Sequence, residues 1–298
     1  MNGDHRVEVF EDLRPRMFGL AYRMLGSVAD AEDIVQEAFL RWRNAEDVRE
    51  PAAFLTTVVT RLCLDHLKSA RARRERYVGP WLPEPLLVDQ MPDAAEAAEL
   101  SDSLSMAFLM VLESLTPAER AAFLLREVFG YEYREIANLL RTSEANVRQL
   151  VHRAKDRIGE RRQRFAADKE KQRELLGRFL LAISTGEVDA LVELLAEDAV
   201  CYTDGGGEVR AARRPIYGPD KIARFLSRIV GDMPVGLESQ VVEANGAPAV
   251  LLRDEEGAWG VVTADASDDK VGAIYILLNP KKLAAIGRSS GEHPASPV

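Results

Sequence analysis

The sequence predicts a multidomain protein: two all-α domains, the second with a helix-turn-helix, followed by an α+β domain. Apolar residues recur at the helical period up to about residue 195, and short alternating strands with turn residues follow. Four prolines within 79–93 end any helix there. The fold class therefore changes midway along the chain, and a linker separates the two helical domains.

The length of 298 residues favours several domains over one. Breaks in the helical pattern at the prolines and near 166–172 set the expected boundaries. The expected segments are the first helical domain at 1–78, a Pro-rich acidic linker at 79–93, the second helical domain at 94–166, the α+β domain at 167–288 and a disordered tail at 289–298.

Three helices are expected in the first domain. The first spans about Val7 to Leu25, and Asp30 is the expected N-cap of the second. Pro51 is well placed as the first residue of the third helix. The apolar stripe of the second helix consists of Ala31, Ile34, Val35, Ala38 and Trp42.

The second domain is expected to begin with a helix from about Ala94 to Leu115. A new helix starts at Pro117 after the N-cap Thr116. Two further helices, Tyr133 to Leu140 and Ser143 to about Phe165, are separated only by Arg141 and Thr142.

The third domain combines helices with a strongly bent antiparallel sheet wrapped around them. Its expected helices are 175–184, 188–195 and 219–229, and its expected strands are 199–203, 209–213, 236–244, 249–253, 257–264 and 270–278.

Charge is segregated along the chain, although its sum is −9. Residues 141–164 carry +5 and residues 61–76 carry +4, whereas residues 84–102 carry −6. Local basic patches, rather than a basic average, are what a nucleic-acid partner requires. The two basic segments are therefore candidate nucleic-acid contacts.

A cytoplasmic protein without a membrane segment is expected. No run of eighteen apolar residues occurs, and the charged N-terminus does not resemble a secretory signal. Cys63 and Cys201 are the only cysteines, which is too few for a disulfide framework or a zinc site. We expect no cofactor and no metal.

The segment from Tyr133 to Ala154 predicts a helix-turn-helix. In its second helix Val147, Leu150 and Val151 lie on the core side, while polar residues face outward. An ordinary αα-hairpin with a solvated face is the alternative, but the excess of Arg favours DNA binding. His152 is expected to be a surface donor, because no second ligand lies at metal-binding spacing.

Residues 1–165 resemble an extracytoplasmic-function (ECF) sigma factor of RNA polymerase. The segment from Asp30 to Trp42 is similar to the family segment that docks on the largest polymerase subunit. This resemblance implies that core RNA polymerase and promoter DNA are partners, in transcription initiation under stress. The implied polymerase-binding residues are Asp33, Gln36, Glu37 and Leu40.

The resemblance also implies two DNA sites, with Arg148 and Gln149 as the candidates for base readout. At the −10 element the implied contacts are Arg61, Lys68, Arg71, Arg73 and Arg74. At the −35 element they are Arg141, Ser143, Glu144, Asn146, Arg148, Gln149, His152 and Arg153.

Residues 168–287 resemble a SnoaL-like, ketosteroid-isomerase-type cone, a fusion found in the SigJ-like group. The motifs that carry this resemblance give the expected regulatory residues, namely Trp81, Leu82, Pro83, Glu84, Pro85, Asp204, Gly205, Gly206, Gly207, Asn279 and Pro280. Glu208 and Lys281 both differ from the family pattern, and the two changes reverse the charge in opposite directions. A contact between them could therefore persist, with the acidic and the basic position exchanged.

In this family the linker lies along the RNA-exit path of polymerase, so its acidic block would mimic nucleic acid. A plain flexible linker is the alternative. The resemblance favours regulation, in which the cone holds the two helical domains in one orientation. A small-molecule ligand of the cone stays open.

Two other functions compete with the sigma factor. One is a transcription factor that binds DNA without polymerase. The other is a cyclase- or isomerase-like enzyme, or a ligand sensor, fused to a DNA-binding domain. The cone has no His, which leaves only Asp204 or Asp265 with Tyr202, Tyr217 or Tyr275 for acid–base chemistry. The glycines at 205–207 favour a tight turn over a phosphate cradle. We therefore expect no enzyme.

Overall fold

The computed structural model describes residues 3–46, 48–74, 77–87, 104–162, 169–231, 233–267 and 269–286. The chain forms two compact units. The N-terminal unit comprises residues 1–76 and 88–163, and the C-terminal unit comprises residues 77–87 and 164–298. Predictions for 88–103, for 163–168 and for the tail at 289–298 lie outside the described residues.

The first three helices form as expected. They are α1 (Gly3–Leu25), α2 (Val28–Asn44) and α3 (Pro51–Arg74). The expected cap of α2 is wrong, because the helix starts earlier: the side chain of Ser27, not that of Asp30, accepts a backbone hydrogen bond, from the N–H of Asp30 at 3.2 Å. Trp42 is fully buried, and its indole N–H donates to the carbonyl of Arg6 at 3.0 Å. These contacts fix α2 on α1.

Further helical elements follow in the described part of the N-terminal unit. They are α5 (Met106–Glu113), α6 (Pro117–Phe123), the π-helix η3 (Leu124–Val128), α7 (Tyr133–Leu140) and α8 (Glu144–Arg162). The side chain of Thr116 caps α6 in a capping box with Glu119, as the sequence predicts. Arg141 takes the left-handed conformation that ends α7, with φ 53°. Ser143 then caps α8 by accepting from the N–H of Asn146.

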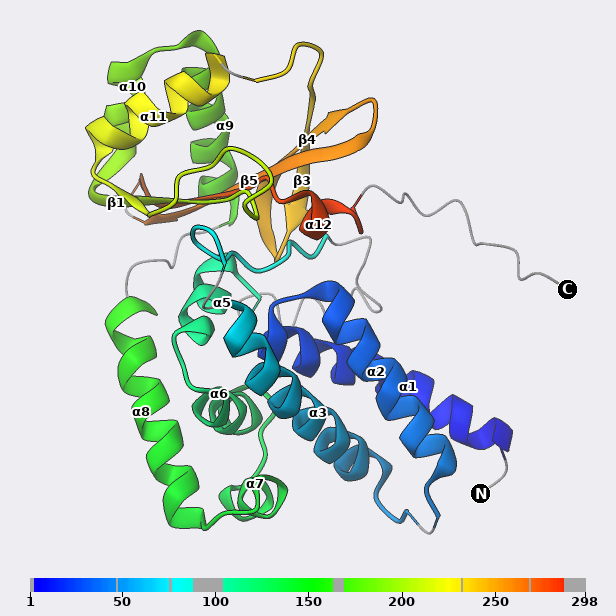
Figure 1. Cartoon of the computed structure of the whole chain (residues 1–298). Helices are drawn as coiled ribbons and strands as arrows, with labels where there is room; N and C mark the ends of the chain where they lie inside the picture. Colours follow the sequence, from blue (N-terminus) through cyan, green and yellow to red (C-terminus); the bar gives the residue numbers. More distant parts are fainter. Residues whose placement is uncertain are drawn as a thin grey trace, which may run out of the picture. The chain divides into compact units, whose positions relative to one another are not determined.

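The two helical domains pack against each other within the N-terminal unit. Figure 1 shows α3 beside both α2 and α6. The guanidinium of Arg120, on α6, is buried and donates to the carbonyl of Met24 at 2.5 Å and to Glu113 at 2.7 Å. The hydroxyls of Thr56 and Tyr131 lie 2.6 Å apart. This interface is thus joined by hydrogen bonds from a buried charge as well as by apolar contact.

The C-terminal unit is a six-stranded sheet with helices, in the order β2-β1-β6-β5-β4-β3. Its elements are α9 (Lys169–Thr185), α10 (Val188–Leu194), β1 (Leu195–Asp204), β2 (Ile216–Tyr217), α11 (Pro219–Gly231), β3 (Glu238–Ala244), β4 (Ala247–Asp254), β5 (Gly257–Ser267), β6 (Lys270–Leu277) and α12 (Pro280–Leu283). Its α+β class confirms the prediction.

Two details of the predicted sheet are wrong. The sheet is mixed, because β1 and β6 run parallel in its centre. A short alternating stretch does not reveal which strand it will join, and the partner of β1 comes from the end of the chain. The expected strand at 209–213 does not form. There the N–H of Ala212 donates to the side-chain oxygen of Thr203 at 2.8 Å, so the segment follows β1 as a loop.

The two faces of the sheet have different roles. Helices α9, α10 and α11 cover one face (Figure 1), where Phe179, Leu191, Cys201 and Ile274 form the core. Because side chains alternate along a strand, Asp204 on β1 points to the other face.

The linker residues 77–87 are tied to the turn between β3 and β4. The N–H of Asn245 donates to the carbonyl of Leu86 at 2.8 Å, and the N–H of Leu86 donates to the Asn245 side chain at 3.2 Å. Leu87 adds an antiparallel bridge to Ala244. The linker therefore extends the sheet of the C-terminal unit.

Candidate functional sites

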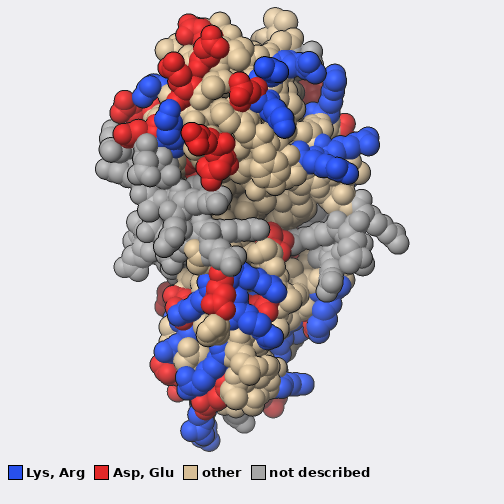
Figure 2. All heavy atoms as spheres, turned by 90° about the vertical axis from the view of Figure 1, so that its left-hand side faces the viewer, with Lys and Arg blue, Asp and Glu red and all other residues tan. Residues whose placement is uncertain are grey.

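The predicted recognition helix α8 has one buried and one exposed face. Val147, Leu150, Val151, Ala154 and Ile158 are buried, which confirms the expected core side. The predicted contact residues Arg141, Ser143, Glu144, Arg148, Gln149, His152 and Arg153 are exposed, and Asn146 is half-buried. Figure 2 shows Lys and Arg gathered over this part of the N-terminal unit.

Several of these side chains already have partners within the unit. Arg148 lies 3.7 Å from Glu144, and His152 lies 2.8 Å from Asp156. Arg153 pairs with Glu119, the buried carboxylate of the α6 capping box, at 3.3 Å. Arg153 is therefore partly a structural tie between α6 and α8.

The other predicted DNA site lies along α3. Arg61 is half-buried and its guanidinium reaches the carbonyl of Leu139, at the end of α7, at 3.5 Å. Lys68 is exposed and pairs with Asp65 at 2.8 Å. Arg71, Arg73 and Arg74 lie in the last turns of α3, and their side chains lie outside the described part of the chain.

The predicted polymerase-binding residues share one face of α2. Asp33, Gln36 and Leu40 are exposed, and Glu37 is half-buried beside Arg41 at 2.9 Å. The buried stripe of α2 faces the opposite way. This face is acidic with one exposed Leu, which suits a basic, partly apolar partner.

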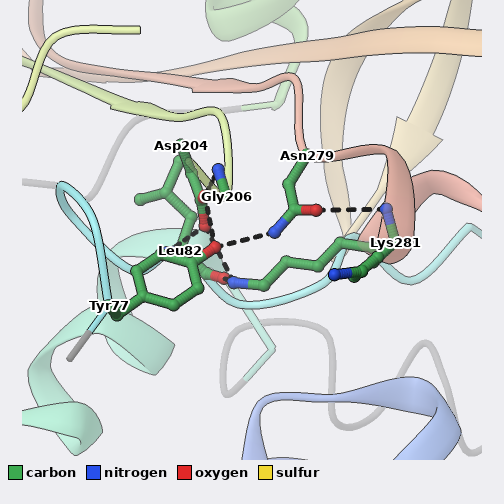
Figure 3. Close-up of polar contacts among 7 residues, drawn as sticks. Tyr77, Leu82, Asp204, Gly206, Asn279 and Lys281 are labelled. Atoms are coloured by element: carbon green, nitrogen blue, oxygen red, sulfur yellow. Dashed lines mark hydrogen bonds and ion pairs between the residues drawn. The ribbon is translucent and has the colours of Figure 1, made fainter. Parts of the chain in front are cut away.

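A buried carboxylate joins the linker to the sheet. Asp204, at the end of β1, has no exposed surface. One of its oxygens accepts from the Tyr77 hydroxyl at 2.6 Å and from the N–H of Gly206 at 3.0 Å. Its other oxygen accepts from the N–H of Leu82 at 2.9 Å (Figure 3). The same oxygen accepts from the ammonium of Lys282 at 2.8 Å. We call Tyr77, Leu82, Asp204, Asn279 and Lys282 the linker clamp.

Lys282 places a second buried charge in the linker clamp. Its side chain is 8% exposed. The ammonium also donates to the carbonyl of Leu82 and lies 3.9 Å from the centre of the Trp81 ring. A cation over an indole face is stabilised by the ring electrons, most strongly where water is excluded. Asp204 and Lys282 therefore neutralise each other while both grip linker residues.

Tyr77 is held from both sides. Its hydroxyl donates to Asp204 and accepts from the side-chain amide of Asn279 at 2.7 Å. Burial, and then the bond to Asp204, raise the pKa of the Tyr77 phenol above its usual value. Tyr77 therefore stays a neutral donor.

The three glycines form a tight turn that serves the clamp. A Cβ on Gly206, whose φ is +65°, would lie 2.5 Å from Asn279. The N–H of Gly206 is occupied by Asp204, which argues against a phosphate cradle. Next to this turn, Lys281 and Glu208 form an ion pair at 2.5 Å. The two residues that depart from the family pattern with opposite changes of charge thus contact each other.

The structure places the remaining motif residues around the clamp. Leu82, Pro83, Pro85 and Gly205 are buried, Trp81, Glu84 and Gly206 are half-buried, and Gly207 and Pro280 are exposed. The sequence analysis missed Tyr77 and Lys282. Lys282 lies three residues after Asn279, the cap of α12, so the helical period could have indicated which of the two adjacent lysines turns inward.

Of the candidate acid–base groups, Asp265 and Tyr275 are brought together. Both are buried, and Tyr275 donates a hydrogen bond to Asp265. The rings of Tyr202 and Tyr275 stack at 5.7 Å, whereas Tyr217 is 62% exposed. Within the described residues, Oδ2 of Asp265 has no hydrogen-bond partner. Burial raises the pKa of Asp265 to about 6.

This raised pKa predicts a dependence of stability on pH. Since the folded protein keeps the Asp265 proton up to about pH 6 and the unfolded chain loses it from about pH 3.8, stability falls across this window. Asp265→Asn should remove up to about 3 kcal/mol of this fall. Urea unfolding of the C-terminal unit between pH 4 and 7.5 tests it, with exposed Glu255→Gln as control. An unchanged slope for Asp265→Asn contradicts the prediction.

Comparison with known families identifies the family to which the chain belongs. The sequence matches the family Sigma-70 region 2 over residues 9–73 and the family Sigma-70, region 4 over residues 105–158. Two ECF sigma factors are 37% and 30% identical to it and align over 98% and 90% of this chain. The chain therefore belongs to the ECF sigma factors, which bind core RNA polymerase and direct promoter recognition. Within the described residues, no helix has the length and apolar character needed to span a bilayer.

The first of these relatives is the ECF RNA polymerase sigma factor SigJ of Mycobacterium tuberculosis, which the alignment covers over 97% of its length. The second is SigG of the same organism, covered over 80% of its length. The crystal structure of M. tuberculosis SigJ has a TM-score of 0.77 and 36% identity, covering 93% of this chain and 98% of that chain. The similarity thus extends through the C-terminal unit.

Proposed function

We propose that the C-terminal unit regulates this sigma factor by holding the linker that follows its first helical domain. The observation that carries this proposal is the linker clamp, in which Asp204 binds both Tyr77 and Leu82. Tyr77 lies three residues after the end of α3, the helix with the proposed −10 contacts. A linker held by the clamp cannot follow a path through polymerase. Binding of the sigma factor to polymerase therefore requires that the linker leave the clamp.

Release is a two-state equilibrium that opposes polymerase binding. If only the released chain binds, the apparent affinity for polymerase is the intrinsic affinity multiplied by the fraction of chains that are released. Opening the clamp breaks the hydrogen bonds of Asp204 to Tyr77 and Leu82, and such bonds stabilise the closed state. A ligand or partner that binds the released state better would activate the factor.

The packing within the N-terminal unit adds a second requirement. A compact domain of roughly 130 residues, which is the described part of this unit, is about 40 Å across. Promoter elements centred at −10 and −35 lie about 25 base pairs apart, which is roughly 85 Å of B-DNA. We infer that α3 and α6 separate when both elements are bound, which breaks the hydrogen bond from Arg120 to the carbonyl of Met24.

The contact residues follow from this assignment. We propose that Asp33, Gln36, Glu37 and Leu40 bind polymerase and that Arg148 and Gln149 read bases of the −35 element, with neighbouring cations on phosphates. Arg61 would exchange the carbonyl of Leu139 for DNA at the −10 element.

We infer a regulatory rather than a catalytic role for Asp204. Each of its two oxygens accepts two hydrogen bonds within the C-terminal unit. A carboxylate engaged in this way has no capacity left for a substrate proton.

The regulatory role is tested by run-off transcription with core polymerase on a genomic promoter library. Trp81→Ala removes the ring under Lys282, so we expect the apparent affinity for core polymerase to rise by about three- to tenfold, through a larger released fraction. Tyr217→Ala, at an exposed residue of the same unit, is the control for loss of an aromatic ring. A chain ending at Phe165 should behave as released. Equal outputs from all variants would exclude the regulatory role.

A further inference from the structure

Two guanidinium groups converge on one tyrosine at the start of the helix-turn-helix. Tyr133 is the first residue of α7 and is half-buried. The guanidinium of Arg148, on α8, lies 4.1 Å from the centre of its ring. That of Arg126, on η3, lies 4.6 Å from the same centre. The ring therefore connects three elements of this domain.

Acidic residues stabilise this arrangement of like charges. Glu132 pairs with Arg126 at 3.0 Å, and Glu144 lies 3.7 Å from Arg148. The hydrogen bond that Arg126 donates to Glu132 raises the pKa of Arg126 above its usual value. Arg126 is additionally fixed by donating to the carbonyl of Tyr131 at 2.9 Å. The ring of Tyr133 thus contacts the guanidinium of Arg126, which is held in place by these bonds. The side chain of Arg148, in contrast, remains 59% exposed.

An exposed arginine normally samples many rotamers, and ordering it on DNA opposes binding. A guanidinium that lies against an aromatic face has fewer conformations to lose, because a cation–π contact favours the stacked ones. The ring leaves the edge of the guanidinium open for hydrogen bonds to a base. Tyr133 therefore prepares Arg148 for a planar, bidentate partner.

We propose that Tyr133 is a positioning residue for sequence readout by Arg148, acting through its ring face rather than its hydroxyl. The proposal rests on the proposed function, in which Arg148 contacts the −35 element. It adds a specificity determinant outside the recognition helix.

The test measures base preference, not only affinity. Holoenzyme made from the full chain and core polymerase selects DNA from a duplex library randomised across the −35 region, and the bound DNA is sequenced. Arg148→Ala identifies the positions that Arg148 reads. Tyr133→Leu should reduce enrichment at those same positions by about two- to fivefold, the range of an exposed cation–π contact.

Three variants separate positioning from other roles. Tyr133→Phe keeps the ring and should preserve the preference. Tyr133→Leu combined with Arg148→Ala should match Arg148→Ala alone, because the two act through one contact. Tyr217→Leu, at an exposed tyrosine of the C-terminal unit, is the control and should change nothing.

Other outcomes overturn the inference in distinguishable ways. If Tyr133→Leu leaves the preference intact while Arg148→Ala alters it, the readout stands and the positioning role fails. If Tyr133→Phe loses as much as Tyr133→Leu, the hydroxyl acts instead. Equal loss at every position indicates unfolding of the domain. If Arg148→Ala changes no position, both the proposed readout and this inference fail.

Discussion

Asp204→Ala is expected to destabilise the C-terminal unit by about 3–5 kcal/mol, because it leaves the Lys282 ammonium buried without its counter-ion. The variant also leaves the Tyr77 hydroxyl and the N–H of Leu82 without their acceptor. Urea unfolding of the full chain, followed by Trp fluorescence, measures the loss. Limited proteolysis should show faster cleavage within 77–87.

A second variant tests whether the uncompensated charge causes the loss. Asp204→Ala with Lys282→Met removes both charges, so part of the stability should return. Glu208→Gln breaks only the exposed pair with Lys281 and should cost less than about 1 kcal/mol. A loss for Asp204→Ala no larger than that of this control would show that the clamp does not stabilise the unit.

Reversing charge on the exposed face of α2 is expected to abolish capture by core polymerase. Asp33→Lys with Glu37→Lys places two cations where a basic partner helix is proposed to lie, and like charges in contact cost several kcal/mol. We expect binding at least about 100-fold weaker, measured by titration of labelled protein with core polymerase. The dependence on salt should also change sign, because attraction becomes repulsion.

The matched control changes the same charge on another helix. Glu11→Lys with Asp12→Lys alters two exposed residues of α1 and should leave capture close to the unmodified value. If both double variants weaken capture equally, the effect arises from net charge, and α2 is not the docking face. Circular dichroism verifies that both variants retain their helices.

Local rules predicted the helices well, and their failures have local causes. Pro51, Thr116 and Ser143 start or cap helices as expected, because a helix start depends on its own few residues. Ser27 and Asp30 both satisfy the capping rule, and the backbone entering α2 selected Ser27. The stretch at 209–213 alternates like a strand, but the hydrogen bond from the N–H of Ala212 to the side chain of Thr203 holds it in a loop.

By itself, the sequence determined the fold class, the recognition helix and the motifs of the linker, since these depend on periodicity, capping and residue type over short distances. Only the tertiary structure decided that the linker joins the sheet of the C-terminal unit and that Tyr77 and Lys282 meet at Asp204. The buried carboxylate of residue 204 has its partners at residues 77 and 282, which are far away in the sequence. No local sequence pattern encodes these contacts. Burial is the physical reason for these contacts, because a buried ion without a partner costs a large amount of free energy.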